Sequence, residues 1–425
     1  MKQWWRLLGW TLTLVLLVAC GGEPSAGSKA AASPTLTVLG TLTGSGETEL
    51  AAVFAPFTAA TGIAVVYEGT DAFDTVLPVR VEAGDPPDFA LFPQLGLLRD
   101  FVDRGQLVPL DTFLDRPTLA DTFAPDLLAL GTVGDRLYGF SLRTYLKSLV
   151  WYRPQVFAAK GYAVPETWEQ WETLRDRIIA DGGVPWCLGL DSGDSTGWVG
   201  TDWIETLLLR TGGPEIYDQW TSHQIPFTHP AVKAAFEQFG RIAQDPRQTL
   251  GGSTGALSLS FQDAPLPLFS DPPGCYLHQQ ASFISAFFPP GVQADETVDI
   301  FPFPALDPAY GRPLVVGDLL VGMLQDSKAG QAFLAYLLTP ESQAIWATFG
   351  GHLSPYQTLG LDAYGDRLSQ RDIEILGSAD TLRYDGSDLM PRAVNRTFAS
   401  GVVDYLSGVP LDQVLETIEA SWTRL

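Results

Sequence analysis

The alternation of strand and helix patterns at the start of the folded body constrains the fold more than any other feature of this sequence. Apolar, β-branched runs typical of strands occupy Thr35–Leu39, Ile63–Tyr67 and Asp88–Phe92. Helical patterns occupy Glu47–Ala60 and Asp71–Gly84 between them. Strand, helix, strand, helix, strand requires right-handed crossovers, and therefore favours a largely parallel sheet covered by helices on both faces. This part of the chain is predicted to be an α/β unit.

A second α/β pattern begins near Tyr145. Thr167 with Gln170 forms a capping box that opens a helix, and Val184–Leu190 is the next apolar strand. A further strand pattern begins at Pro313. With 46% hydrophobic and 11% aromatic residues, the chain of 425 residues can build the cores of two domains.

The N-terminal segment has the features of a secretory signal. Lys2 and Arg6 precede the apolar run Leu7–Ala19. As a helix this run would cover only about 20 Å, which is less than the ~30 Å hydrocarbon core of a bilayer. Residues 1–19 are therefore predicted to be a signal peptide, not a permanent membrane span.

The residues around Cys20 resemble the bacterial lipobox, because Leu17, Val18 and Ala19 precede the cysteine. The resemblance implies that the Cys20 thiol receives a diacylglycerol that anchors the protein to the membrane. The alternative is an ordinary signal peptide with a coincidental cysteine. Gly, Ser, Ala and Pro dominate the next residues, so we expect residues 20–34 to be the lipidated cysteine and a flexible linker.

Charge and cysteine content limit the partners and cofactors. A formal net charge of −23 disfavours nucleic acid and anionic lipid surfaces, and makes a neutral or cationic ligand the easier partner. Apart from Cys20, the chain has only Cys187 and Cys275, which outside the cytoplasm either form a disulfide or stay as two buried thiols. The four histidines have no metal-ligand spacing, so we expect no metal and no cofactor.

Catalytic motifs are weak in this sequence, whereas residues suited to sugars are common. Gly251–Gly255 fits the pattern of a nucleophile elbow, but it follows a loop instead of a strand. Trp198 lies in a polar, glycine-rich stretch, which favours exposure at a cleft over burial in a core. Flat rings suit the CH faces of pyranoses, and nearby carboxylates such as Asp202 suit their hydroxyl groups.

Six segments, in the same order, resemble the alpha-glucoside-binding lipoproteins of bacterial carbohydrate ABC importers. These segments are Asp88–Phe101, Tyr138–Tyr152, Gly161–Trp171, Pro185–Trp220, Cys275–Ile284 and Tyr384–Pro391. The resemblance implies an α/β, two-lobe periplasmic-binding-protein-like fold, with a mostly parallel sheet flanked by helices in each lobe and a ligand cleft between the lobes. It also implies hinge closure over the ligand. The expected N-terminal lobe comprises residues 35–144 and 313–350, and the C-terminal lobe residues 145–312 and 351–425.

The resemblance and the strand ends together predict the residues that contact the ligand. They are Thr70, Asp71, Gln94, Arg143, Lys147, Trp198, Asp202, Trp203, Gln280, Phe283 and Asp318. Some of them have structural alternatives: Asp71 as a helix cap, Gln94 as a turn-stabilising amide, Asp318 as a buried structural carboxylate, and Trp203, one of four clustered tryptophans, as a core residue. Arg143 and Lys147 could equally form ion pairs across the hinge.

The function that follows is a substrate-binding lipoprotein, expected to be monomeric and not an enzyme. It would capture a neutral sugar, such as an alpha-glucoside or a related oligosaccharide, outside the membrane and deliver it to an ABC permease. The alternative is a surface-anchored glycoside hydrolase or a carbohydrate-binding adhesin.

Overall fold

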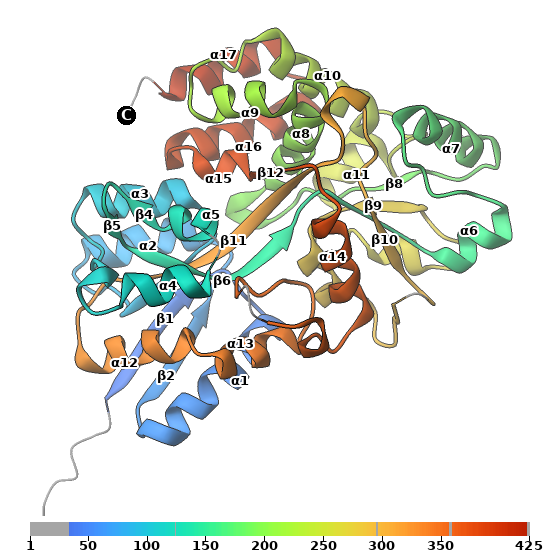
Figure 1. The fold of residues 1–425 in the computed structure, drawn as a ribbon. Coiled ribbons are helices and arrows are strands. Elements are labelled where there is room, and N and C mark those ends of the chain that lie inside the picture. The colour runs from blue at the N-terminus through green and yellow to red at the C-terminus, as the bar shows by residue number, and fades with distance from the viewer. Residues whose placement is uncertain (1–33, 124, 295, 357–358, 423–425) are drawn as a thin grey trace, which may run out of the picture. The chain divides into compact units, whose positions relative to one another are not determined.

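Two β-sheets surrounded by helices form the body of the protein (Figure 1). The computed structural model describes residues 34–123, 125–294, 296–356 and 359–422. The predicted signal peptide and Cys20 lie outside the described residues. The helices are α1 Ser45–Thr61, α2 Phe73–Glu82, α3 Leu95–Asp103, α4 Arg116–Thr122, α5 Pro125–Leu130, α6 Pro154–Lys160, α7 Trp168–Ala180, α8 Trp198–Thr211, α9 Gly213–Thr221, α10 Pro230–Ala243, α11 Gly252–Ser258, α12 Lys328–Leu337, α13 Pro340–Ala347, α14 Arg367–Gly377, α15 Gly386–Leu389, α16 Arg392–Leu406 and α17 Leu411–Trp422.

The larger sheet has the strand order β12-β11-β3-β1-β2, with β6 paired to β11. Its strands are β1 Thr35–Gly40, β2 Ala64–Gly69, β3 Phe89–Phe92, β6 Gly139–Leu146, β11 Pro313–Met323 and β12 Thr381–Tyr384. As the sequence predicts, β1 pairs in parallel with both β2 and β3. The long strand β11 runs antiparallel to β3 and β6 and parallel to β12. A separate two-stranded hairpin joins β4 Thr132–Val133 to β5 Arg136–Leu137.

The smaller sheet has the order β10-β7-β9-β8. Its strands are β7 Leu149–Tyr152, β8 Trp186–Cys187, β9 Leu277–Gln279 and β10 Asp299–Pro302. The α/β class and the two-sheet arrangement agree with the prediction, but this sheet is not mostly parallel. Only β8 and β9 pair in parallel, and β7 runs antiparallel to both β9 and β10.

The chain passes between the sheets at two places. Only Lys147 and Ser148 separate β6 in the larger sheet from β7 in the smaller one, and β10 leads back to β11. β6 and β11 lie side by side, which places both crossings next to one another (Figure 1). Lys147 therefore lies at the crossing between the lobes, as the sequence predicts. Because β12 joins the larger sheet from residues assigned to the other lobe, the exact lobe boundaries stay a prediction.

The helices pack in separate groups. Helices α8, α9, α10, α16 and α17 pack against one another, and α8 also contacts β11. Helix α1 packs on β2 and α13 beside the larger sheet, whereas α14 contacts β10 of the smaller one. No helix in the described part of the chain is both long and apolar enough to span a bilayer.

A disulfide fixes the smaller sheet. Cys187 at the end of β8 is bonded to Cys275, and their Cα atoms are 5.4 Å apart. Both cysteines are fully buried. The bridge links residues 88 positions apart in sequence and so holds together the two segments from which β8 and β9 are formed.

Candidate ligand-binding site

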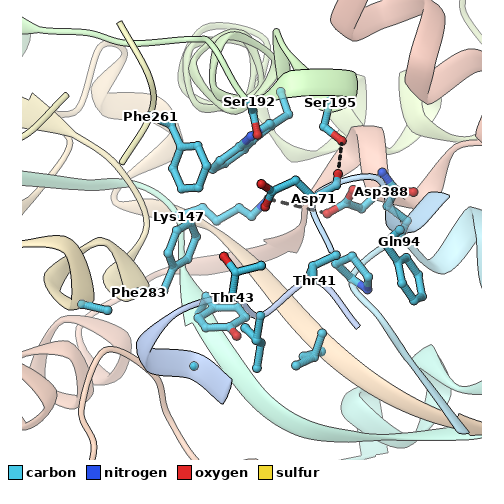
Figure 2. A pocket seen from close by; sticks show the side chains of 18 of the residues that line it. Thr41, Thr43, Asp71, Gln94, Lys147, Ser192, Ser195, Phe261, Phe283 and Asp388 are labelled. Atoms are coloured by element: carbon cyan, nitrogen blue, oxygen red, sulfur yellow. Dashed lines mark hydrogen bonds and ion pairs between the residues drawn. The ribbon is translucent and has the colours of Figure 1, made fainter. Parts of the chain in front are cut away.

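A cavity of about 240 Å³ lies where the ends of the larger sheet's strands meet the helices of the other lobe. Strand ends of an open α/β sheet are the usual position for a ligand, so its place agrees with the prediction from the strand pattern. Figure 2 shows Asp71, Lys147 and Asp388 pointing into it, with Phe261 and Phe283 along one side. Eight of the predicted residues line this cavity: Asp71, Gln94, Arg143, Lys147, Trp198, Asp202, Phe283 and Asp318.

Aromatic rings form one wall of the cavity. The Trp198 ring centroid lies 5.3 Å from that of Phe261 and 6.0 Å from that of Phe283. Trp198 is the first residue of α8, and Gly197 before it has a φ of 109°. A Cβ atom at residue 197 would lie 2.1 Å from the carbonyl oxygen of Ala399, so only glycine allows this entry into the helix. The wall offers flat apolar faces of the kind that pack against a sugar ring.

Lys147 is the centre of a buried charge network beside the ring wall. Its Nζ atom lies 3.2 Å from Asp202 and 3.6 Å from Asp388, and it also pairs with Asp385. The same Nζ lies 5.8 Å from the centroid of Trp198. Burial lowers the pKa of Lys147, but the four surrounding acids outweigh burial and raise it well above 10.5. The lysine is therefore charged and holds the carboxylates of two cavity-lining residues in place.

The acids around Lys147 have different proton affinities. Burial, together with the charges of Asp385 and Glu205, raises the pKa of Asp202 well above its usual range. Burial and the charge of Asp385 raise the pKa of Asp388 to about 7. Burial acts on Asp385 too, but Lys147 and the hydrogen bonds to Asp385 hold its pKa below the usual value. Asp202 and Asp388 can consequently both donate and accept protons in hydrogen bonds, as a hydroxyl-bearing ligand requires.

Asp318 ties the two long strands together at the cavity floor. It accepts hydrogen bonds from the Ser141 hydroxyl, from Thr144 Oγ1 at 3.0 Å and from its neighbour's backbone N–H, Leu319, at 2.8 Å. Burial raises its pKa to about 7, and these three hydrogen bonds oppose the shift. Asp318 therefore lines the cavity, where the sequence predicts it. Its three hydrogen bonds also make it a buried structural carboxylate, which is the alternative that the sequence leaves open.

Polar contacts join the two sides of the cavity. Gln94 follows β3 and donates to Asn395 Oδ1 at 3.3 Å, so its amide reaches the other lobe instead of stabilising its own turn. Ser195 Oγ donates to the backbone oxygen of Asp71 at 3.4 Å, a contact drawn in Figure 2. Within the described residues, the Asp71 side chain makes no capping hydrogen bond to α2. Its carboxylate is thus available to a ligand.

Three predicted residues do not line the cavity among the residues that the structure describes. Trp203 is fully buried, with its ring 4.8 Å from Trp186 and 5.7 Å from Phe303, so its prediction as a stacking residue is wrong. Thr70 Oγ1 accepts from the N–H of residue 72, and Gln280 Oε1 accepts from the N–H of residue 281. Both side chains serve the local backbone.

The sequence did not single out several residues that line the cavity. They are Thr41, Thr43, Glu49, Asp74, Ser192, Ser195, Phe261, His352 and Asn395, together with Asp388, which the sequence suggested only as a cap. Thr41 and Thr43 follow β1, so the strand-end rule could have found them. No three His, Cys, Asp or Glu side chains of the described chain are grouped so as to hold a metal ion.

The comparisons with known proteins agree with this fold. The family model "Bacterial extracellular solute-binding protein" matches residues 40–344, and the chain belongs to this family of ABC importer receptors. The chain is 45% identical to the "Osmoprotective compounds-binding protein GgtB" of Synechocystis sp., over 97% of this chain and 98% of that one. It is 38% identical to the "Alpha-glucosides-binding periplasmic protein AglE" of Rhizobium meliloti, over 92% of this chain and 87% of that one.

Solved structures show the same fold at low sequence identity. A chitin oligosaccharide binding protein superposes with a TM-score of 0.80 at 20% identity, covering 93% of this chain and 99% of that one. A maltose-bound protein of T. maritima, MalE3, superposes with a TM-score of 0.74 at 16% identity, covering 92% of this chain and all of that one. Both of these relatives by sequence are named as binding proteins.

Proposed function

We propose that this chain is the receptor of an ABC importer for a small, neutral, alpha-linked glucoside, held by the ring wall and by the acids around Lys147. The observation that carries the proposal is the composition of the cavity. Trp198, Phe261 and Phe283 offer apolar ring faces, and Asp71, Asp202, Asp388 and Gln94 offer hydrogen-bonding groups. A pyranose ring has this same combination of apolar faces and hydroxyl edges.

The size and charge of the cavity support a small uncharged ligand. A volume of about 240 Å³ suits one or two sugar units better than a long chain. Six carboxyl side chains line it, against Lys147 and Arg143 as the only lysine or arginine among the described lining residues. An anionic sugar would meet this acidic surface unfavourably.

The names of two relatives support the same ligand class. One relative is named for osmoprotective compounds and the other for alpha-glucosides. The second description names the proposed ligand class, and the first is compatible with it. We further propose that the mature chain works as a single, lipid-anchored copy outside the cytoplasm and passes its ligand to permease subunits.

Calorimetry and thermal unfolding of the lipid-free body, residues 21–425, would test the proposal. The panel would contain maltose, trehalose, sucrose, smaller glucosides and longer maltodextrins. We expect one-to-one binding of a small member, with a melting temperature that rises with ligand concentration. We also expect the sugar to be recovered intact, because a hydrolase would release reducing sugar. Absence of both heat and thermal shift over the whole panel would overturn the proposal.

A further inference from the structure

The loop that carries His352 is held against strand β6. Gly350 and Gly351 have φ values of 75° and 70°, which allow the tight turn after α13. Leu353 then forms an isolated antiparallel bridge with Thr144, with N–H to oxygen distances of 2.8 Å in both directions. Because Arg143 precedes Thr144 and His352 precedes Leu353, the bridge fixes both residues at one end of the cavity.

His352 is buried and has an unused ring nitrogen. Its side chain lines the cavity with 1% of the residue exposed, and its ring packs edge-on against Trp346 with centroids 5.5 Å apart. Nε2 has no hydrogen-bond partner among the described residues. Burial, together with the charge of Arg143, lowers the pKa of His352 well below 6.5. The ring is therefore neutral near pH 7, with one nitrogen protonated and the other an acceptor, and we assign the acceptor role to the unpartnered Nε2.

Glu49 and Arg143 lie at the same end of the cavity. Arg143 Nη1 donates to Glu49 Oε2 at 3.1 Å, with side-chain exposures of 5% and 15%. The Arg143 guanidinium also lies over the Trp346 ring, 4.8 Å from its centroid, while its Nε has no hydrogen-bond partner within the described chain. The cluster thus combines a fixed cationic donor with two acceptors, one charged and one neutral.

We propose that Glu49, Arg143 and His352 form a hydroxyl-reading subsite in which His352 Nε2 accepts a proton from one sugar hydroxyl and Arg143 donates to a neighbouring oxygen. The subsite deepens the proposed function and rests on it. A deoxy or O-methyl sugar has no proton to give at this position, so Nε2 would stay buried without a partner and binding would weaken. Because Arg143 is already paired with Glu49, a carboxylate or phosphate placed there would meet a neutralised cation and the acceptor Nε2.

Two substitutions of His352 distinguish the loss of a hydrogen-bond acceptor for the ligand from the loss of packing against Trp346. His352→Phe keeps an aromatic ring beside Trp346 but removes the acceptor, whereas His352→Gln keeps an acceptor and loses the ring. With the sugar that binds the unaltered protein, we expect His352→Phe to weaken binding at least tenfold. His352→Gln should stay within about threefold of the unaltered protein. The unaltered protein should also discriminate against one mono-deoxy analogue of that sugar, and His352→Phe should not.

The outcomes distinguish this subsite from the proposed function. Equal affinity of His352→Phe and the unaltered protein would overturn the subsite while leaving sugar binding intact. A protein that binds no sugar would overturn both. Glu49→Gln is a second test of the subsite, to be used if His352→Phe does not fold. It changes a side chain that is partly exposed. It should weaken binding at least threefold, and unchanged affinity would count against the subsite.

Discussion

Among the predictions made here, removal of the Lys147 charge has the largest expected effect on the stability of the free protein. The lysine side chain is 10% exposed and faces Asp202 and Asp385, which are 2% and 0% exposed, and Asp388, which is 14% exposed. Lys147→Met keeps the length of the side chain but leaves these carboxyl groups without their cation. Breaking a buried ion pair of this kind costs about 3–5 kcal/mol. At roughly 2 °C per kcal/mol for a chain of this size, the melting temperature should fall by about 6–10 °C at pH 8.

The fall in melting temperature caused by Lys147→Met should be larger at high pH than at low pH. Without Lys147, the neighbouring acids bind protons more tightly in the folded state than in the unfolded chain. A carboxyl group with a raised folded pKa is stabilising at low pH, and that stability is lost as the pH rises through its folded pKa. The difference between Lys147→Met and the unaltered protein should therefore be smaller at pH 5 than at pH 8.

Thermal scans of the ligand-free protein at pH 5 and pH 8 would measure both effects. Lys160→Met is the matched control, because Lys160 ends α6 and is exposed. A Lys147→Met variant that melts like Lys160→Met at pH 8 would refute the reasoning. So would a destabilisation of the same size at both pH values.

Three further predictions test other parts of the site and fold. Trp198→Ala should weaken sugar binding by about 2 kcal/mol, or roughly 30-fold, while Trp198→Phe retains most of the affinity in calorimetry; equal affinities would show that the ring does not contact the ligand. The folded pKa of Asp318, about 7, lies above its usual 3.8, so its contribution to stability is lost as the pH rises from about 4 to 7. Asp318→Asn should accordingly flatten the pH dependence of the melting temperature, and an unchanged slope would contradict the pKa. Replacing Cys187 and Cys275 with Ala should lower the free energy of unfolding by about 2–5 kcal/mol in denaturant titrations; an unchanged midpoint would show that the bridge adds no stability.

The strand-end rule predicted one part of the site from sequence alone. Asp71 and Gln94 follow β2 and β3, and both line the cavity because parallel strands bring their carboxyl ends to one edge. The crossing at Lys147 could also be predicted, since a strand pattern continues on either side of it.

The error at Trp203 has a geometric cause. Trp198 and Trp203 are five residues apart on α8, which places them about 140° apart around the helix axis. One of the two rings can line the cavity only if the other faces away from it. The polar, glycine-rich residues around Trp198 indicate that this ring is the exposed one, and no glycine-rich stretch follows Trp203.

Other site residues depend on tertiary contacts that leave no local pattern. His352 reaches the cavity through the pairing of Leu353 with Thr144, which lie 209 positions apart in the numbering. In sequence, Glu49 resembles any solvent-exposed acid near the start of a helix. Its role depends on the ion pair with Arg143, which is 94 positions away in the chain. Asp388 has the sequence signature of a helix cap, but the structure places its carboxyl group beside Lys147.

A crystal structure of the protein with its bound sugar would test the central claim most directly. The account predicts one sugar ring against the face of Trp198, with its hydroxyl groups within hydrogen-bond distance of Asp202, Asp388 and the Glu49–Arg143–His352 subsite. A sugar bound away from this cavity, or one in the cavity that touches neither Trp198 nor the acids around Lys147, would contradict it.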